Sequence, residues 1–233
     1  MGAAGARPGG EPLPLAVVLL SGGMDSCVAA AIAREEHELA LLHLGYGQRT
    51  EERERRAFRD IARHWGVART LESRLDHLKA VGGSALTDAT RDAVAARRSG
   101  SPVPDTYVPF RNTHLLALAV SWGEVIGARR IVIGAVEEDG SGYPDCREEY
   151  FAAFNRMLRL GTRPETDLEV VTPVLHMSKA DIVREGIRLG APLHLTWSCY
   201  TESEVACGVC ESCLLRLRGF ASAGAVDPIP YRS

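Results

Sequence analysis

Leu15–Ser26 reads LAVVLLSGGMDS, and this stretch decides the fold. Its first six residues form a continuous apolar run, which is typical of a parallel strand buried on both faces. Two glycines follow directly, and a helical pattern runs from about Asp25 through Ala33. The segment therefore predicts a strand, a tight glycine turn and a helix, in that order.

The same alternation continues along the chain. We expect further strands at Leu39–Leu44, Arg130–Ala135 and Leu168–Val171, and helices at Glu51–Trp65, His114–Ile126, Glu148–Leu160, Ser178–Leu189 and Leu214–Phe220. Strands that alternate with helices at this spacing imply a parallel sheet with crossover helices. The predicted fold class is α/β: a doubly wound, Rossmann-like parallel sheet with a small Cys-rich C-terminal appendage.

The chain shows no internal repeat and no second composition regime. We divide it into a disordered leader at 1–14, an α/β domain at 15–195, and a metal-binding segment at 196–233 that packs on the same domain. Two irregular stretches, 81–109 and 137–146, interrupt the pattern. In α/β sheets the loops beyond the carboxyl ends of the strands build the ligand site, so we expect these stretches near it.

Charge and hydropathy exclude several classes of protein. The 233 residues are 45% hydrophobic and 24% charged, and the net charge of −3 disfavours a dedicated nucleic-acid binder. No stretch approaches the roughly 20 apolar residues of a membrane span, and the N-terminus lacks the apolar core of a signal peptide. We expect a cytoplasmic protein that acts on small molecules, with neither nucleic-acid nor membrane partners.

The glycine turn is a candidate phosphate site. Two glycines let the backbone approach a ligand closely, and the N–H groups of the turn and the helix N-terminus favour an anion. The alternative is an ordinary turn with Asp25 or Ser26 as the N-cap. The full SGGxDS string directly after a strand favours phosphate binding, although it is not a Walker loop. The predicted ATP-binding residues are Leu20, Ser21, Gly22, Gly23, Met24, Asp25 and Ser26.

Four of the six cysteines crowd into the last fifth of the chain, at Cys199, Cys207, Cys210 and Cys213. Structural zinc takes four soft ligands in a tetrahedron, and C-x-x-C turns present pairs at that geometry. Four protein ligands close the site, which predicts one structural zinc per chain. An iron–sulfur cluster suits the same run, and unrelated buried thiols are the remaining alternative. We expect Cys27 to be a buried helix residue and Cys146 a loop thiol near the site.

Four further segments narrow the family: YGQR at 46–49, VPFRN at 108–112, SGYPDCR at 141–147 and TWSCY at 196–200. Together with SGGMDS and the cysteine run, they resemble the 7-cyano-7-deazaguanine synthase family, one of the N-type ATP pyrophosphatases. The resemblance runs in order from about Leu15 to Tyr231. A single such segment is weak evidence, whereas six ordered ones are strong.

The resemblance implies a reaction. Enzymes of this family convert 7-carboxy-7-deazaguanine, ammonia and ATP, with Mg²⁺, into the nitrile 7-cyano-7-deazaguanine, a precursor of queuosine and archaeosine. ATP gives AMP to the carboxylate, pyrophosphate leaves, and ammonia displaces AMP to form an amide whose oxygen is then activated in turn. The resemblance also implies a homodimer. No glutaminase domain fits in this length, so we expect free ammonia to be the nitrogen donor.

The resemblance also implies site residues. Catalytic roles fall to Asp25, Ser26, Arg111 and Lys179, and substrate binding to Tyr46, Gln48, Arg49, Asn112, Tyr143, Asp145 and Arg147. The three arginines can hold carboxylate or phosphate groups in bidentate contacts, although each alone is most often a solvated residue. Asn112 and Asp145 can pair with a guanine-like edge, and Tyr143 can stack on the ring. We interpret His43 as a core histidine and Glu51–Arg56 as a solvated helix face.

One departure and three alternatives accompany this interpretation. Glu137–Gly140 reads EEDG where the family pattern leads us to expect an aromatic or hydroxyl residue near Gly140, so the fit of the substrate there is open. A tRNA thiolase would need an RNA-binding surface and a catalytic cysteine pair. A non-enzymatic zinc-knuckle protein would not need the SGGxDS, VPxRN and SGYPDCR segments. A relative that stops at the amide, or uses another amine, also fits the sequence.

Overall fold

The computed structural model describes residues 12–88, 90–91, 103–137 and 142–232. Its centre is a sheet of five parallel strands in the order β3-β2-β1-β4-β5. The strands are β1 Leu15–Leu19, β2 Glu38–Gly45, β3 Thr70–Arg74, β4 Arg130–Ile133 and β5 Glu169–Val171. In the register of the sheet, Val18 of β1 pairs with Leu41 of β2 on one side and with Val132 of β4 on the other.

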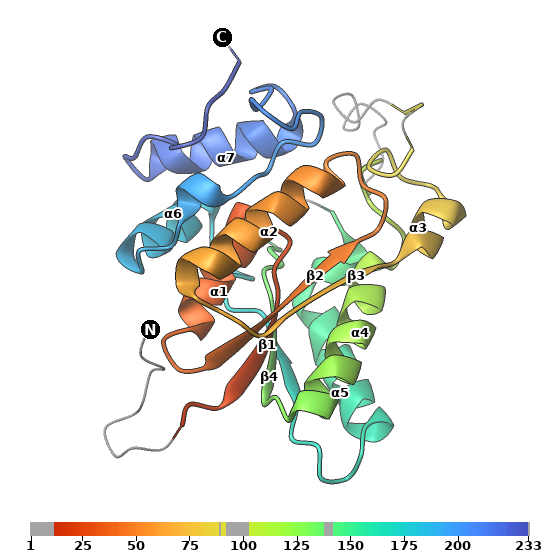
Figure 1. Ribbon diagram of the computed structural model, residues 1–233. Coiled ribbons are helices and arrows are strands. Elements are labelled where there is room, and N and C mark those ends of the chain that lie inside the picture. The colour runs from red at the N-terminus through yellow and green to blue at the C-terminus, as the bar shows by residue number, and fades with distance from the viewer. Residues whose placement is uncertain (1–11, 89, 92–102, 138–141, 233) are drawn as a thin grey trace.

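Helices cover both faces of the sheet (Figure 1). The first face packs against α1 Met24–Ala33, α2 Glu51–Trp65 and α6 Lys179–Arg188, and the second against α4 Arg111–Ile126 and α5 Glu148–Gly161. The side chains of β1 alternate between the two cores, because Ala16 and Val18 face the first and Val17 and Leu19 the second. Helix α7, Glu211–Ser222, packs on α6, and the short α3, Asp76–Val81, follows β3. The predicted doubly wound α/β fold is confirmed.

The predicted elements all form, with ends that differ by a few residues. Strand β4 stops at Ile133, two residues early, because Gly134 lies against the start of α1: a Cβ there would be 2.6 Å from the Ser26 nitrogen. His43 is buried with its Nδ1 3.1 Å from the Leu20 carbonyl oxygen, which confirms that it is a core histidine, but its Nε2 is buried without a hydrogen-bond partner among the described residues, so the expectation of a fully satisfied ring is wrong. The prediction missed β3, whose sequence TLESR is polar because the strand lies at the sheet edge and is half exposed.

The C-terminal segment is anchored by a buried ion pair. The Arg216 guanidinium on α7 donates to both carboxylate oxygens of Asp227, at 2.8 and 2.9 Å, and both side chains are almost fully buried. It also donates to the Thr196 hydroxyl at 2.6 Å and to the Leu193 carbonyl at 3.1 Å. This arginine therefore ties α7, the chain end and the segment before Cys199 together. The division of the chain at residue 195 stays a prediction.

Two expectations concern regions that the structure describes only in part. Most of the predicted leader at 1–14 lies outside the described residues, as do Glu138, Asp139 and Gly140 of the departing segment. Among the residues that are described, no helix combines the length and the apolarity that crossing a membrane requires.

Candidate active site

A cavity of about 310 Å³ opens at the carboxyl ends of β1, β2 and β4. This is the edge where ligands bind in open α/β sheets. The phosphate loop lies at one end, and three tyrosines, Tyr46, Tyr143 and Tyr200, lie among the other lining residues. Ser198 and Ser212 of the cysteine segment complete the wall. The cavity therefore draws on all six of the segments that the sequence singled out.

The phosphate loop is held by its own hydroxyl groups. Ser26 Oγ donates to the Gly23 carbonyl at 2.9 Å and lies 3.0 Å from Ser21 Oγ, which accepts from the Gly23 N–H at 3.2 Å. Gly23 is the N-cap of α1, and no side chain caps this helix. The alternative with Asp25 or Ser26 as the N-cap is therefore wrong. An uncapped helix N-terminus that faces a cavity has N–H groups and a helix dipole suited to an anion.

Gly22 serves a different purpose from the one that the sequence suggests. Its φ is +92°, and an added Cβ would lie 2.5 Å from the Glu54 carbonyl oxygen and 3.0 Å from the Ala57 Cβ. Because Gly22 has no side chain, the loop can approach α2 closely. Gly22 itself does not line the cavity. Its carbonyl accepts a hydrogen bond from the Trp197 N–H at 2.8 Å. The loop is thus clamped between α2 and the C-terminal segment.

Lys179 and Asp25 form an ion pair at the loop. The Lys179 Nζ donates to Asp25 Oδ2 at 2.7 Å. Lys179 begins α6, whose N-cap Ser178 accepts from the Asp181 N–H. The other carboxylate oxygen, Asp25 Oδ1, is buried and has no hydrogen-bond partner among the described residues. The pair places an ammonium group and an unused carboxylate oxygen beside the phosphate loop, and that oxygen fits a Mg²⁺ ligand.

Aromatic side chains gather around Arg111. The Arg111 Nη1 donates to the Tyr46 hydroxyl at 3.1 Å, and its guanidinium lies 5.5 Å from the Tyr46 ring centroid. Its Nε is buried without a hydrogen-bond partner among the described residues. Burial raises the pKa of Tyr46, Tyr143 and Tyr200, so all three are neutral phenols at physiological pH. This region offers flat apolar surfaces and a cation with an unsatisfied donor.

Gln48 and Arg49 line the cavity but hold other parts of the protein. Gln48 accepts from the Tyr46 N–H at 2.9 Å and donates to Glu54 Oε2 at 2.9 Å. Arg49 donates to the Ala85 and Asp88 carbonyls at 3.1 and 2.9 Å, and so orders the loop after α3. Both side chains border the cavity as expected, while their roles toward a substrate stay predictions.

Asn112 and Asp145 are bonded to each other. Asp145 Oδ2 accepts from the Asn112 N–H at 2.9 Å, and the Asn112 amide donates to the Asp145 carbonyl at 2.7 Å. Both residues are buried, and of the two only Asn112 borders the cavity. The exposed Arg147 guanidinium pairs with Glu149 at 3.6 Å and does not line the cavity. Of the predicted substrate-binding residues in these two segments, Asn112 and Tyr143 therefore border the cavity, whereas Asp145 and Arg147 do not.

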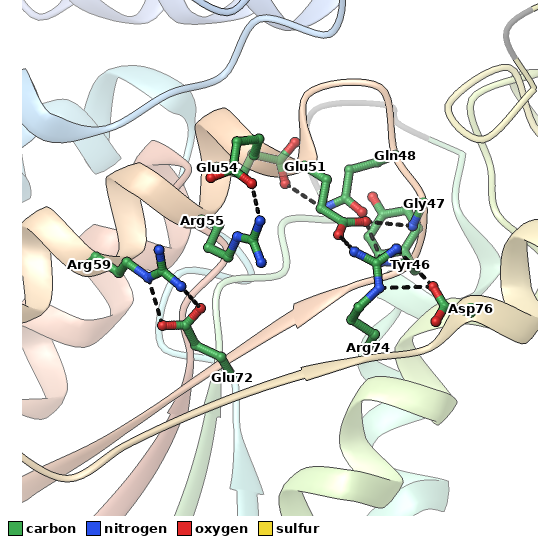
Figure 2. A network of polar contacts seen from close by, with 11 residues as sticks. Tyr46, Gly47, Gln48, Glu51, Glu54, Arg55, Arg59, Glu72, Arg74 and Asp76 are labelled. Atoms are coloured by element: carbon green, nitrogen blue, oxygen red, sulfur yellow. Dashed lines mark hydrogen bonds and ion pairs between the residues drawn. The ribbon is translucent and has the colours of Figure 1, made fainter.

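The interpretation of Glu51–Arg56 as a solvated helix face is wrong for its inner half. Glu51 accepts from the Gly47 N–H at 2.8 Å and pairs with Arg74 (Figure 2). Glu54 accepts from Thr50 and Gln48 and borders the cavity. The sequence did not indicate these contacts, because the pattern of a charge-rich helix does not show which carboxylate side chain will contact the loop that precedes the helix.

The four clustered cysteines converge. Their Sγ atoms all lie within 4.8 Å of one another, and Cys207 Sγ is 3.9 Å from Cys213 Sγ. A tetrahedral ion with bonds of about 2.3 Å separates its ligands by roughly 3.8 Å. Backbone N–H groups at 3.3–3.4 Å point at Cys199 and Cys207, which stabilises thiolates. This group can hold a metal ion such as zinc.

The two remaining cysteines are neutral thiols. Burial raises the pKa of Cys27 to about 12 and that of Cys146 to about 11. Cys27 lies in the core on α1, and Cys146 borders the cavity and accepts from the Asn112 amide at 3.3 Å. Both expectations are confirmed. The cavity residues that the sequence did not assign include Glu54, Tyr200 and Arg216, and of these three only Tyr200 lies within one of the quoted segments.

Comparison with known proteins agrees with this arrangement. The model of the family "Queuosine biosynthesis protein QueC" matches residues 15–224. The 7-cyano-7-deazaguanine synthase of Chlorobaculum tepidum is 57% identical over 93% of this chain and 96% of its own length, and that of Acidobacterium capsulatum is 55% identical over the same shares. The resemblance seen in the sequence is confirmed, and the chain belongs to the QueC family of queuosine biosynthesis proteins.

Proposed function

We propose that this protein is a ligase that converts 7-carboxy-7-deazaguanine, ammonia and ATP into 7-cyano-7-deazaguanine. The observation that carries the proposal is the identity of 57% over almost the whole chain to a 7-cyano-7-deazaguanine synthase. The cavity supports it, because a phosphate loop and an aromatic, cationic region border one space. A plain zinc-binding module accounts for neither feature, and a tRNA thiolase would need a catalytic cysteine pair, whereas the two cysteines outside the cluster are buried neutral thiols.

ATP binds at the phosphate loop in this proposal. The loop residues that border the cavity, Leu20, Ser21 and Gly23–Ser26, and the uncapped N-terminus of α1 hold the phosphates, and Lys179 neutralises charge beside them. Asp25 Oδ1, buried and without a partner in the described chain, is the protein ligand for the Mg²⁺ that accompanies ATP. Because Lys179 bonds to the other oxygen of Asp25, this carboxylate is fixed before the nucleotide arrives.

The deazaguanine carboxylate lies at the Arg111 end. Its ring packs among Tyr46, Tyr143 and Tyr200, and its carboxylate accepts from the unsatisfied Arg111 Nε. A carboxylate oxygen attacks the α-phosphorus of ATP, and pyrophosphate leaves. Ammonia then displaces AMP to give the amide, whose oxygen takes AMP from a second ATP. Loss of that AMP and of both amide protons leaves the nitrile.

Zinc, the dimer and the compartment complete the proposal. The four thiolates hold one structural Zn²⁺, since their close approach suits a single ion better than a larger iron–sulfur cluster. Exposed apolar side chains on α4 and α5, including Val125, Met157 and Leu160, support association into a homodimer. We infer that the protein works in the cytoplasm on small molecules, without nucleic acid.

The experiment is to incubate the purified protein with 7-carboxy-7-deazaguanine, ATP, Mg²⁺ and either ammonia or glutamine, and to weigh the products by mass spectrometry. We expect the nitrile with ammonia, a transient 7-amido-7-deazaguanine that the protein also accepts, and no product with glutamine. An amide that accumulates as a dead end would replace the proposal by an amide-forming ligase. No product at all would refute the substrate assignment.

A further inference from the structure

Thr196–Cys199, which we name the strap, runs from the buried Arg216 network to the first cysteine and passes along the phosphate loop. The Trp197 N–H donates to the Gly22 carbonyl at 2.8 Å. A Cβ on Gly23 would lie 3.6 Å from the Trp197 carbonyl oxygen, so the strap touches both glycines. The position of the loop backbone therefore depends on the position of Trp197.

The Trp197 side chain is fixed mainly by the cysteine cluster. It is 2% exposed and packs with Cys199, Cys210 and Ala57 in one apolar cluster. Its Nε1 donates to the Glu202 carbonyl at 2.9 Å, and the Glu202 N–H in turn donates to Cys199 Sγ at 3.4 Å. A chain of contacts thus leads from a metal-ligating sulfur through Glu202 and the indole to the loop.

The far side of the indole is closed by helix α2. The Arg53 guanidinium lies 4.4 Å from the centroid of the Trp197 ring, a close cation–π contact. Ala57 of the same helix belongs to the same cluster and also meets Gly22, because a Cβ on Gly22 would be 3.0 Å from the Ala57 Cβ. The indole therefore sits in a fixed slot between the cysteines and the helix that supports the loop.

A second contact joins the cysteine cluster to the nucleotide end of the cavity. Helix α7 begins directly after Cys210, its N-cap, and carries Gly219 against Lys179: a Cβ there would lie 2.9 Å from the Lys179 Cβ. Lys179 donates to Asp25 beside the loop. The cysteine cluster therefore supports two separate parts of the nucleotide end, through Trp197 and through α7.

From these contacts we propose that Trp197 is a positioning residue that couples metal occupancy of the cysteine cluster to nucleotide binding at the phosphate loop. The inference rests on the proposed function in that the loop binds ATP. A coupling of this kind is reciprocal: the metal raises affinity for nucleotide, and bound nucleotide retains the metal. The deazaguanine end of the cavity is a separate case: Tyr200, which borders it, follows Cys199 directly and packs on the same apolar cluster, so the metal can act on that end without the indole of Trp197.

The test replaces Trp197 by phenylalanine, which keeps an apolar ring but removes the hydrogen bond to Glu202 and part of the surface under Arg53. Calorimetry with α,β-methylene-ATP and, separately, with 7-carboxy-7-deazaguanine measures the two affinities, and metal analysis measures zinc. We expect about ten-fold weaker analogue binding, which is the loss of roughly one hydrogen bond with its packing, and deazaguanine affinity within two-fold of wild type. The matched control is Trp122→Phe on α4, which should change neither affinity.

A second measurement needs no variant. Zinc release from the wild-type protein to a chelating dye is followed with and without saturating α,β-methylene-ATP. We expect the analogue to slow release several-fold. An unchanged release rate, or a fully metallated W197F that binds the analogue like wild type, would overturn the inference alone. A wild-type protein that binds no nucleotide would overturn the proposed function as well.

Discussion

At the scale of single residues, Gly22 shows how a glycine can be required by packing and not by the ligand. Gly22→Ala must place a Cβ against the Glu54 carbonyl at a φ of +92°. We expect it to lower the free energy of unfolding by at least about 2 kcal/mol, from backbone strain and steric overlap together. Gly66→Ala is the control, because its φ of +67° carries the backbone cost with no atom within 4 Å of the new Cβ.

Urea denaturation of the two variants checks this prediction. The control should lose only about 1 kcal/mol, the cost of a left-handed backbone for an alanine. Equal losses at both positions would show that the contact of the loop with α2 is looser than the structure describes.

Arg111 has a role that can be separated from nucleotide binding. Arg111→Lys keeps the charge but cannot keep both the bond to Tyr46 and the free Nε donor. We expect the KM for 7-carboxy-7-deazaguanine to rise about ten- to hundred-fold, the loss of one charged hydrogen bond, with ATP affinity unchanged. Steady-state kinetics with each substrate varied in turn measures the KM for 7-carboxy-7-deazaguanine and the KM for ATP separately. A rise in the KM for ATP alone would place Arg111 at the phosphates instead.

Cys146 carries a prediction about pH. Its thiol pKa is raised by burial from 9.0 to about 11, so at pH 8 it holds about a hundred-fold less thiolate than an unperturbed cysteine. Alkylation of native protein by iodoacetamide, followed by peptide mass spectrometry, should be correspondingly slow at pH 8 and should accelerate as the pH rises toward 11. Labelling at the rate of a free thiol would show that Cys146 is not buried as described.

At the scale of elements, the cysteine segment and α7 form one unit with the metal. Cys210→Ser removes one ligand of a closed site and should lower zinc from about one per chain to less than half, together with solubility, because metal binding contributes folding free energy. Cys27→Ala is the control: it leaves a small cavity in the core but all four ligands, so zinc should stay near one per chain. Stoichiometric iron with visible absorbance in anaerobically purified protein would contradict the zinc assignment.

The elements also show where sequence patterns succeed. Buried strands such as β1 and long helices such as α5 have strong periodicity and were predicted nearly to the residue. Strand β3 was missed because TLESR has no apolar run, and an edge strand needs none. The bonds of Gln48 to Glu54 and of Asn112 to Asp145 were also out of reach, because a motif shows that polar residues matter and not whether they face a ligand or each other.

At the scale of the whole molecule, the place of the site was predictable and its inner contacts were not. Parallel strands put the loop after β1 and the segment around Arg111 at one edge of the sheet, as the alternation of elements implies. The hydrogen bond from Trp197 to Gly22 joins positions 175 residues apart (197 − 22), and the bond from Arg216 to Thr196 joins positions 20 residues apart. Such contacts depend on the final packing, and no local pattern encodes them.

In the proposed reaction, both oxygens of the substrate carboxylate leave on AMP. The most direct measurement uses 7-carboxy-7-deazaguanine with both carboxylate oxygens labelled by ¹⁸O, together with unlabelled ATP and ammonia, and analyses the nucleotides by mass spectrometry. We expect two AMP for each nitrile formed, each carrying one ¹⁸O on its phosphoryl group. Formation of ADP, or AMP without the label, would contradict adenylation of the substrate whatever the product.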